Sequence, residues 1–139
     1  MGAAVARSSA ATVNGSISSQ YLKDPASPVW ANDATVKQYK TIMAKYLPSA
    51  NANNGLYFYG FAKADTFVRA MSKAGTNPTR AGLMKALLSF NETSPFLLPG
   101  SKLKTSTTDH FIISHQRLMT YTAPLWTGNG ALIDGRPRG

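Results

Sequence analysis

The stretch that decides the fold is Asn54–Gly75, with the sequence NGLYFYGFAKADTFVRAMSKAG. At 3.6 residues per turn its apolar and small side chains share one broad helical face, and its basic side chains fall on the opposite side. The members of that face are Tyr57, Gly60, Phe61, Ala64, Phe67, Val68, Met71 and Ala74, with Phe58 at its edge. Gly75 follows as a C-terminal cap, because a residue without Cβ takes a positive φ at little cost. We therefore predict a helix whose apolar face is centred near Phe61 and Val68 and is covered by more than one neighbour.

The bulk composition describes one domain or part of one. The chain has 139 residues, 43% of them hydrophobic and 15% charged, and no cysteine, which excludes disulfides and thiolate zinc sites. No apolar run approaches the ~20 residues of a membrane span. The net charge of +9 comes from fifteen basic and six acidic residues that are spread singly along the chain. This pattern favours a solvated basic surface over a specific nucleic-acid site, although binding of an anionic polymer stays an alternative.

The remaining elements are shorter. We expect a strand over residues 16–22, helices over Ala34–Leu47 and Arg80–Phe90, and a long strand over His110–Tyr121 with Phe111, Ile113 and Leu118 facing inward and a bulge along it. The N-caps of the two helices are expected at Asn32-Asp33 and at Thr79. By domain, residues 1–15 form a flexible segment, 16–127 the folded part and 128–139 a loose tail.

Two further patterns have simple structural interpretations. Asp65 and Arg69 are four residues apart on the central helix and predict a surface ion pair worth about 0.2–0.5 kcal/mol. Gly128-Asn129-Gly130 lacks the spacing and context of a phosphate-binding loop, so we predict a turn there.

The two histidines are the candidate metal ligands. His110 and His115 are five residues apart, so in the predicted strand their side chains point to opposite faces. That geometry and the lack of a nearby carboxylate cluster argue against a metal site, and the sequence calls for no metal or other cofactor.

A small serine or histidine hydrolase acting on esters or lactones is the alternative from another functional class. Its residues would be Ser114, either histidine and one aspartate, with the candidate aspartates being Asp109, Asp65 and Asp33. No G-x-S-x-G elbow exposes a serine at a sharp turn, so we assign no catalytic residue.

The order of features along the chain resembles a known family. The segments that carry the resemblance are Ser19–Pro25, Pro28–Asp33, the helix end Met43–Tyr46, Tyr59–Ala62, Leu97–Gly100, Thr105–Asp109, Gln116–Met119 and Trp126. Together they resemble the C-terminal third of the substrate-binding protein of an ABC importer, of the branched-chain amino acid (Leu/Ile/Val-binding) type. The resemblance covers about residues 10 to 135.

This resemblance implies an α/β chain, a partial type I periplasmic-binding-protein fold with three helices and crossing strands but without most of the parent sheets. It implies a non-enzymatic fragment that handles amino acids or similar small solutes, with a membrane permease as partner only for the full-length parent. The ligand contact of the family falls near Leu56 or Tyr57, although in this chain both residues are expected in the core. The parent family is periplasmic, whereas residues 1–14 show no signal peptide, so as given the chain would be cytoplasmic. Because the sheet beneath the helices is missing, we expect a homo-oligomer.

Overall fold

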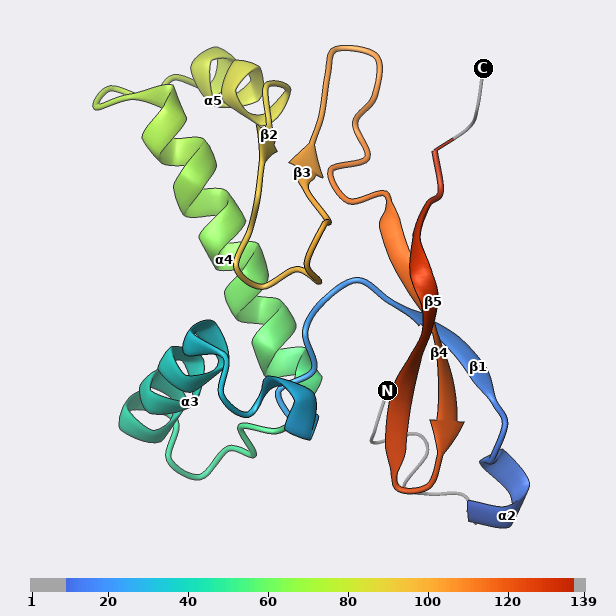
Figure 1. Cartoon of the computed structure of the whole chain (residues 1–139). Helices are drawn as coiled ribbons and strands as arrows, with labels where there is room; N and C mark the ends of the chain where they lie inside the picture. Colours follow the sequence, from blue (N-terminus) through green and yellow to red (C-terminus); the bar gives the residue numbers. More distant parts are fainter. Residues whose placement is uncertain (1–9, 137–139) are drawn as a thin grey trace.

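The computed structural model describes residues 10–136 and places them in two parts that lie side by side (Figure 1). One part consists of helices with a small two-stranded sheet, and the other is a three-stranded sheet. In chain order the elements are α2 (Ala10–Val13), β1 (Ile17–Gln20), the 3-10 helix η1 (Pro28–Trp30), α3 (Ala34–Tyr46), α4 (Gly55–Ala74), α5 (Arg80–Leu87), β2 (Asn91–Glu92), β3 (Leu103–Lys104), β4 (His115–Thr122) and β5 (Leu125–Asp134).

The chain crosses between the two parts twice. The larger sheet is antiparallel in the order β1-β4-β5, with Ile17 opposite Thr120 and Tyr121 opposite Trp126. The chain leaves this sheet after β1, builds the helical part and the β2-β3 pair, and returns as β4 (Figure 1). The described chain is therefore three principal helices and crossing strands, as expected.

Helix α3 begins where the sequence predicts. The carboxylate of Asp33 accepts from the backbone N–H groups of Thr35 at 3.0 Å and Val36 at 3.1 Å, which satisfies two donors of the first turn. Its other oxygen binds Lys23 Nζ at 2.6 Å, so the same residue ties the first crossing segment to the helix. The core residues on α3 are Val36, Tyr39 and Met43. Leu47, predicted as the last helical residue, instead follows the helix and is 47% exposed.

Helix α4 has the predicted ends but buries a different side. Asn54 caps its start and Gly75, with φ at +87°, ends it. Its buried residues are Phe58, Ala62 and Ala70, whereas Val68, predicted near the centre of the buried face, is 60% exposed, and Phe61 is half-buried. The helix is apolar around most of its circumference, so the pattern does not select a side. Packing against Tyr39 and Phe96 selects it instead.

Arg69 lies on the protein-facing side of α4, although the helical wheel predicts it on the side that faces solvent. Its guanidinium binds Asp65 at 2.7 Å, as predicted from their spacing, and also Glu92 at 3.1 Å. Lys73 adds a contact of 3.2 Å to Glu92. Burial alone would raise the pKa of Glu92, but hydrogen bonds from Lys73 and Arg69 outweigh it and lower that pKa. This ion-pair network holds α4 beside the β2 strand.

The strand predicted over His110–Tyr121 is shorter in the structure, where β4 covers His115–Thr122. Strand β4 begins at His115, because side chains close a turn before it: Ser106 Oγ accepts from the Asp109 N–H and Asp109 Oδ1 accepts from the Phe111 N–H. Phe111, predicted to face inward, is therefore 78% exposed, and Leu118 is 40% exposed. The predicted irregularity is present, because the β4-β5 register shifts between Gln116 and Leu118.

The segment predicted as a turn and a loose tail is a strand up to Asp134. Strand β5 contains residues 128–130, and Gly128 there lies so close to Arg117 that a Cβ would meet its Cδ at 2.9 Å. Hydrogen bonding to β4 orders this glycine-rich sequence, which has little strand propensity of its own. Helix α5 also ends earlier than predicted, at Leu87, although Thr79 caps it as expected. Of the predicted flexible segment, residues 1–9 lie outside the described part, and residues 10–13 form α2.

Candidate functional site

The residues indicated by the family resemblance lie in the first turn of α4. The Oδ1 of Asn54 accepts from the Leu56 N–H at 3.0 Å, which fixes the entry of the chain into the helix. Leu56 is 75% exposed and Tyr57 is 41% exposed, so the expectation that they belong to the core is wrong. The next residue, Phe58, is completely buried and takes the core position instead. The first turn of α4 thus presents two large side chains to the outside of a fixed helix end.

A cluster of aromatic rings packs against the core side of this turn. The ring of Tyr39 meets those of Phe58 and Phe61 edge-on, with centroids 5.0 Å apart in both pairs, and Phe58 lies 5.2 Å from Phe96. Burial raises the pKa of Tyr39, and the neighbouring Tyr57 raises it further. The Tyr39 hydroxyl is buried and has no hydrogen-bond partner within residues 10–136. The site therefore has a rigid base, since such ring pairs add about 0.5–1.5 kcal/mol each to area burial.

The first crossing segment adds a second support. Lys23, whose side chain is only 10% exposed, binds Asp33 and lies 5.4 Å above the ring of Trp30. Burial raises the pKa of Tyr21, and the charge and hydrogen bond of Tyr59 raise it further. These contacts connect the start of α3 and the second turn of α4 to the strand that leaves the sheet.

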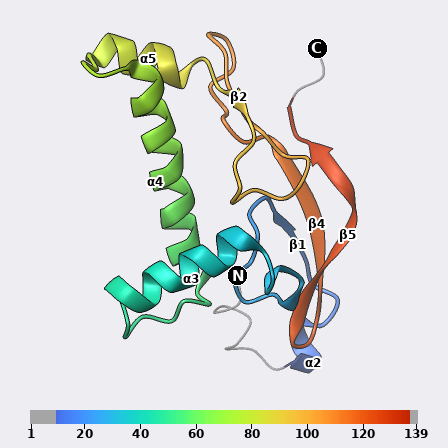
Figure 2. The same ribbon diagram turned by 60° about the vertical axis from the view of Figure 1, so that its left-hand side comes forward.

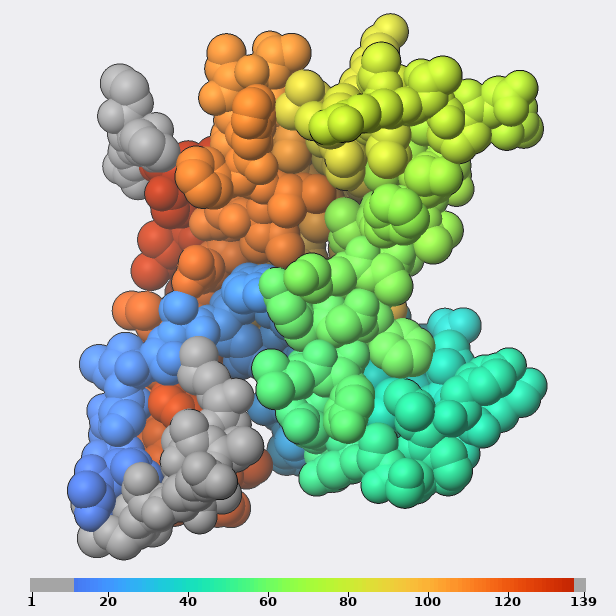
Figure 3. All heavy atoms as spheres, turned by 180° about the vertical axis from the view of Figure 1, so that it is seen from behind, coloured from blue at the N-terminus to red at the C-terminus, as the bar shows by residue number. Residues whose placement is uncertain are grey.

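An open groove of about 560 Å³ lies next to the site. The groove lies between α4 and the segment before β4, and the segment after β1 also lines it. These three segments come together in the view from behind (Figure 3). Its lining is mostly apolar, with Lys63, His110 and Gln116 among the polar residues. Sequence reasoning missed this groove, because its walls come from segments that only the fold brings together.

The candidate hydrolase residues are not assembled into a catalytic set. Asp109 accepts a backbone hydrogen bond, Asp65 binds Arg69, and Asp33 binds Lys23, so each candidate aspartate has another partner. His110 Nε2 lies 3.2 Å from the carbonyl of Thr107. Neither histidine is paired with any of the three predicted carboxylates.

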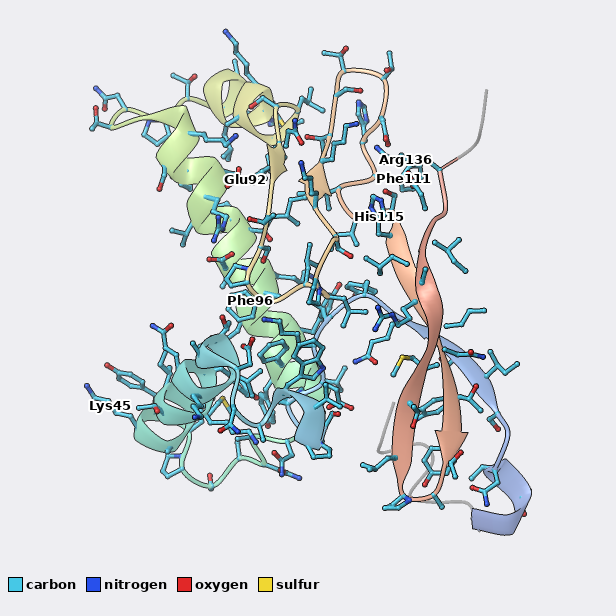
Figure 4. All side chains as sticks on the ribbon, in the orientation of Figure 1. Lys45, Glu92, Phe96, Phe111, His115 and Arg136 are labelled. Atoms are coloured by element: carbon cyan, nitrogen blue, oxygen red, sulfur yellow. The ribbon has the colours of Figure 1, made fainter. Side chains whose placement is uncertain are left out.

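His115 does face one aspartate that the sequence did not indicate, Asp134. His115 and Arg136, which binds the same aspartate, lie close to each other at the start of β4 (Figure 4). The Nε2 of His115 lies 3.9 Å from Asp134 Oδ2, which is too long for a hydrogen bond, and its Nδ1 lies 3.5 Å from Ser114 Oγ. Arg136 binds Asp134 at 2.7 Å and holds the pKa of that carboxyl far below its ordinary value. The β4-β5 register creates this contact, so no spacing rule could have found it.

Two other kinds of site have no candidate within the described part of the chain. Within residues 10–136, no three His, Asp or Glu side chains come together in a group that could hold a metal ion. In the same range, no helix has both the length and the apolar character needed to cross a membrane. The first turn of α4 and the adjacent groove therefore remain the candidate site.

Comparison with known proteins agrees with the resemblance drawn from the sequence. The model of the family described as periplasmic binding protein matches residues 1–124. No curated protein matches the chain. A solved structure, described as a branched chain amino acid ABC transporter from Thermus thermophilus with bound valine, has the same fold with a TM-score of 0.73 at 14% identity. The similarity covers 89% of this chain and 34% of that one, so the chain spans about a third of that structure's length. Since the family match extends over most of its sequence, this chain belongs to the periplasmic binding protein family.

Proposed function

We propose that this chain supplies one wall of the solute-binding cleft of an ABC importer's binding protein, acting in the periplasm, and that Leu56 and Tyr57 contact the solute. The observation that carries the proposal is the exposure of these two side chains, 75% and 41%, at the capped start of α4. Because Leu56 is 75% exposed, its side chain adds little to the core, and it gives an apolar solute a surface to contact.

The proposed solute is an amino acid with an aliphatic side chain, or a similar small molecule. The similar structure from Thermus thermophilus is described with bound valine, which supports this class by analogy of fold alone. The chemistry of the two residues agrees with it. Leu56 suits a branched aliphatic group, and Tyr57 offers both an aromatic ring and a hydroxyl that can donate or accept a hydrogen bond.

The 139-residue chain should bind such a solute weakly. Small-molecule sites usually bury 70–90% of the ligand surface, whereas the first turn of α4 is a single wall. With half or more of the contacts missing, we expect a dissociation constant of about 1 mM or weaker. Calorimetry that gave micromolar affinity for leucine, isoleucine or valine would contradict this one-wall interpretation.

The test is a titration of the isotopically labelled chain with valine up to about 50 mM, followed by amide chemical shifts. We expect concentration-dependent shifts confined to the amides around Leu56 and Tyr57, and their loss in Leu56→Ser. Val29→Ser is the matched control, because Val29 is 76% exposed and belongs to η1. Glycine, which has no side chain, should produce much smaller shifts. If valine shifts no amide near α4, or shifts the whole chain equally, the proposed site is wrong.

A further inference from the structure

The groove beside the first turn of α4 has the size of a small-molecule site. Its volume of about 560 Å³ falls within the roughly 300–1,000 Å³ that such sites usually have. Figure 2 shows α4 along one side of the molecule and β4 with β5 along the other. The groove lies between them, because α4, the segment before β4 and Gln116 of β4 all line it. Leu56 and Tyr57 do not line it, so the groove is a separate place from the proposed solute contact.

The fold forms the base of the groove in advance. Leu97 lines the groove and is 3% exposed. Next to it, the Leu98 N–H donates to the Tyr21 carbonyl at 2.9 Å. In the segment before β4, the carbonyl of Ile112 accepts from the Lys104 N–H, also at 2.9 Å. A ligand that enters the groove therefore meets walls that are already ordered, which lowers the cost of binding.

The walls of the groove are rich in aromatic side chains. Four tyrosine and phenylalanine rings line it: Tyr21, Tyr59, Phe67 and Phe111. Phe67 and Phe111 are 56% and 78% exposed, so both have surface left for a ligand to cover. Aromatic rings pack well against other rings in offset or edge-on arrangements. The lining therefore suits a ligand whose apolar body is an aromatic ring.

The groove carries a positive charge and no negative one. Lys63 lines it, whereas no aspartate or glutamate of the described residues does. Asp65 and Asp109 are next in sequence to lining residues, but Asp65 binds Arg69. The Oδ1 of Asp109 accepts from the Phe111 N–H at 3.0 Å. Lys63 itself forms no ion pair within residues 10–136, so its charge is free to attract an anion.

A tyrosine ring, and not a carboxylate, holds the ammonium group of Lys63. Its Nζ lies 4.9 Å from the centroid of the Tyr59 ring, which is a cation–π distance. Tyr59 is in turn hydrogen-bonded to Tyr21 of the first crossing segment. An ammonium group held by a ring keeps its N–H donors available. A carboxylate in the groove can therefore bind it through a charge-assisted hydrogen bond.

From these observations we propose that the groove binds a monocarboxylate with an aromatic body and no amino group. The ligand ring lies among the four aromatic side chains, and the carboxylate accepts a hydrogen bond from Lys63. An amino group is disfavoured because no carboxylate among the described lining residues can pair with an ammonium, which would lose water without gaining a partner. Lys63 would also repel it. This ligand class therefore differs from the amino acid proposed to contact Leu56 and Tyr57.

The test is a titration of the isotopically labelled chain with 3-phenylpropionate up to about 20 mM at neutral pH, followed by amide chemical shifts. We expect shifts at the amides of residues 59–67 and 111–113. The amine 3-phenylpropylamine has the same body and the opposite charge, and at these amides it should bind about fivefold more weakly or worse. Acetate has the charge without the ring and should shift none of them.

Two lysine variants separate a specific contact from the general attraction of a basic chain. Lys63→Gln removes the charge but keeps most of the stem, so it should weaken 3-phenylpropionate by about fivefold and leave the neutral 3-phenylpropanol unchanged. Lys45→Gln is the matched control, because Lys45 Nζ also lies 4.9 Å from a tyrosine ring, that of Tyr46, but does not line the groove. Phe67→Ala should weaken the acid and the alcohol alike.

Three results would overturn the proposal. The first is that 3-phenylpropionate shifts no groove amide at about 20 mM, whatever valine does near Leu56. The second is equal affinity for the acid and the amine. The third is an equal effect of Lys63→Gln and Lys45→Gln, which would mean that the net charge of the chain attracts the carboxylate. The valine shifts at Leu56 and Tyr57 test the proposed function separately.

Discussion

The buried side of α4 can be tested with two identical substitutions on one helix. Phe58 is completely buried, with Tyr39 5.0 Å and Phe96 5.2 Å from its ring, whereas Phe67 on the same helix is 56% exposed. Truncating a buried phenylalanine costs about 3–5 kcal/mol, and the loss of two ring pairs places Phe58→Ala near 4 kcal/mol. Phe67→Ala should cost at most about 1 kcal/mol, because less than half of its surface is buried and alanine favours the helix.

These costs are large enough to measure. A domain of this size has a total stability of about 5–15 kcal/mol, and 4 kcal/mol corresponds to a fall in melting temperature of roughly 10–15 °C. Urea and thermal unfolding at low micromolar concentration are the assays, repeated after dilution so that association does not contribute. Equal losses for Phe58→Ala and Phe67→Ala would show that α4 does not bury the side that carries Phe58. A larger loss for Phe67→Ala would restore the side predicted from the helical wheel.

Two further predictions concern the helix ends. Burial alone would raise the pKa of Asp33, but the hydrogen bond from Lys23 outweighs it, so in the folded chain this pKa lies below its ordinary 3.8. The stabilisation that ionised Asp33 provides is therefore present above pH 3.8 and is lost as the pH falls through the lower pKa of the folded chain. Asp33→Asn keeps a good N-cap without the charge, so between pH 7 and about pH 3 its urea midpoint should fall less than that of the wild type. Gly75→Ala should cost about 1 kcal/mol because φ is +87°. Gly60→Ala, inside the same helix, should not destabilise the chain. Equal melting temperatures for these two variants would contradict the prediction.

The sequence predicted those features of the fold that depend on neighbouring residues. The starts of α3 and α5 were found because Asp33 and Thr79 accept hydrogen bonds from N–H groups two or three residues ahead. The end of α4 was found because Gly75 can take a positive φ. The ion pair of Asp65 and Arg69 follows from helical spacing.

The features that failed depend on contacts between distant segments. The burial of Phe58 rather than Val68 is decided by α3 and by Phe96, which the wheel of α4 does not contain. The order of β5 comes from its pairing with β4, because the sequence around Gly128 has little strand propensity. The candidate site was indicated only by family resemblance, since neither Leu56 nor Tyr57 has a local signal of function.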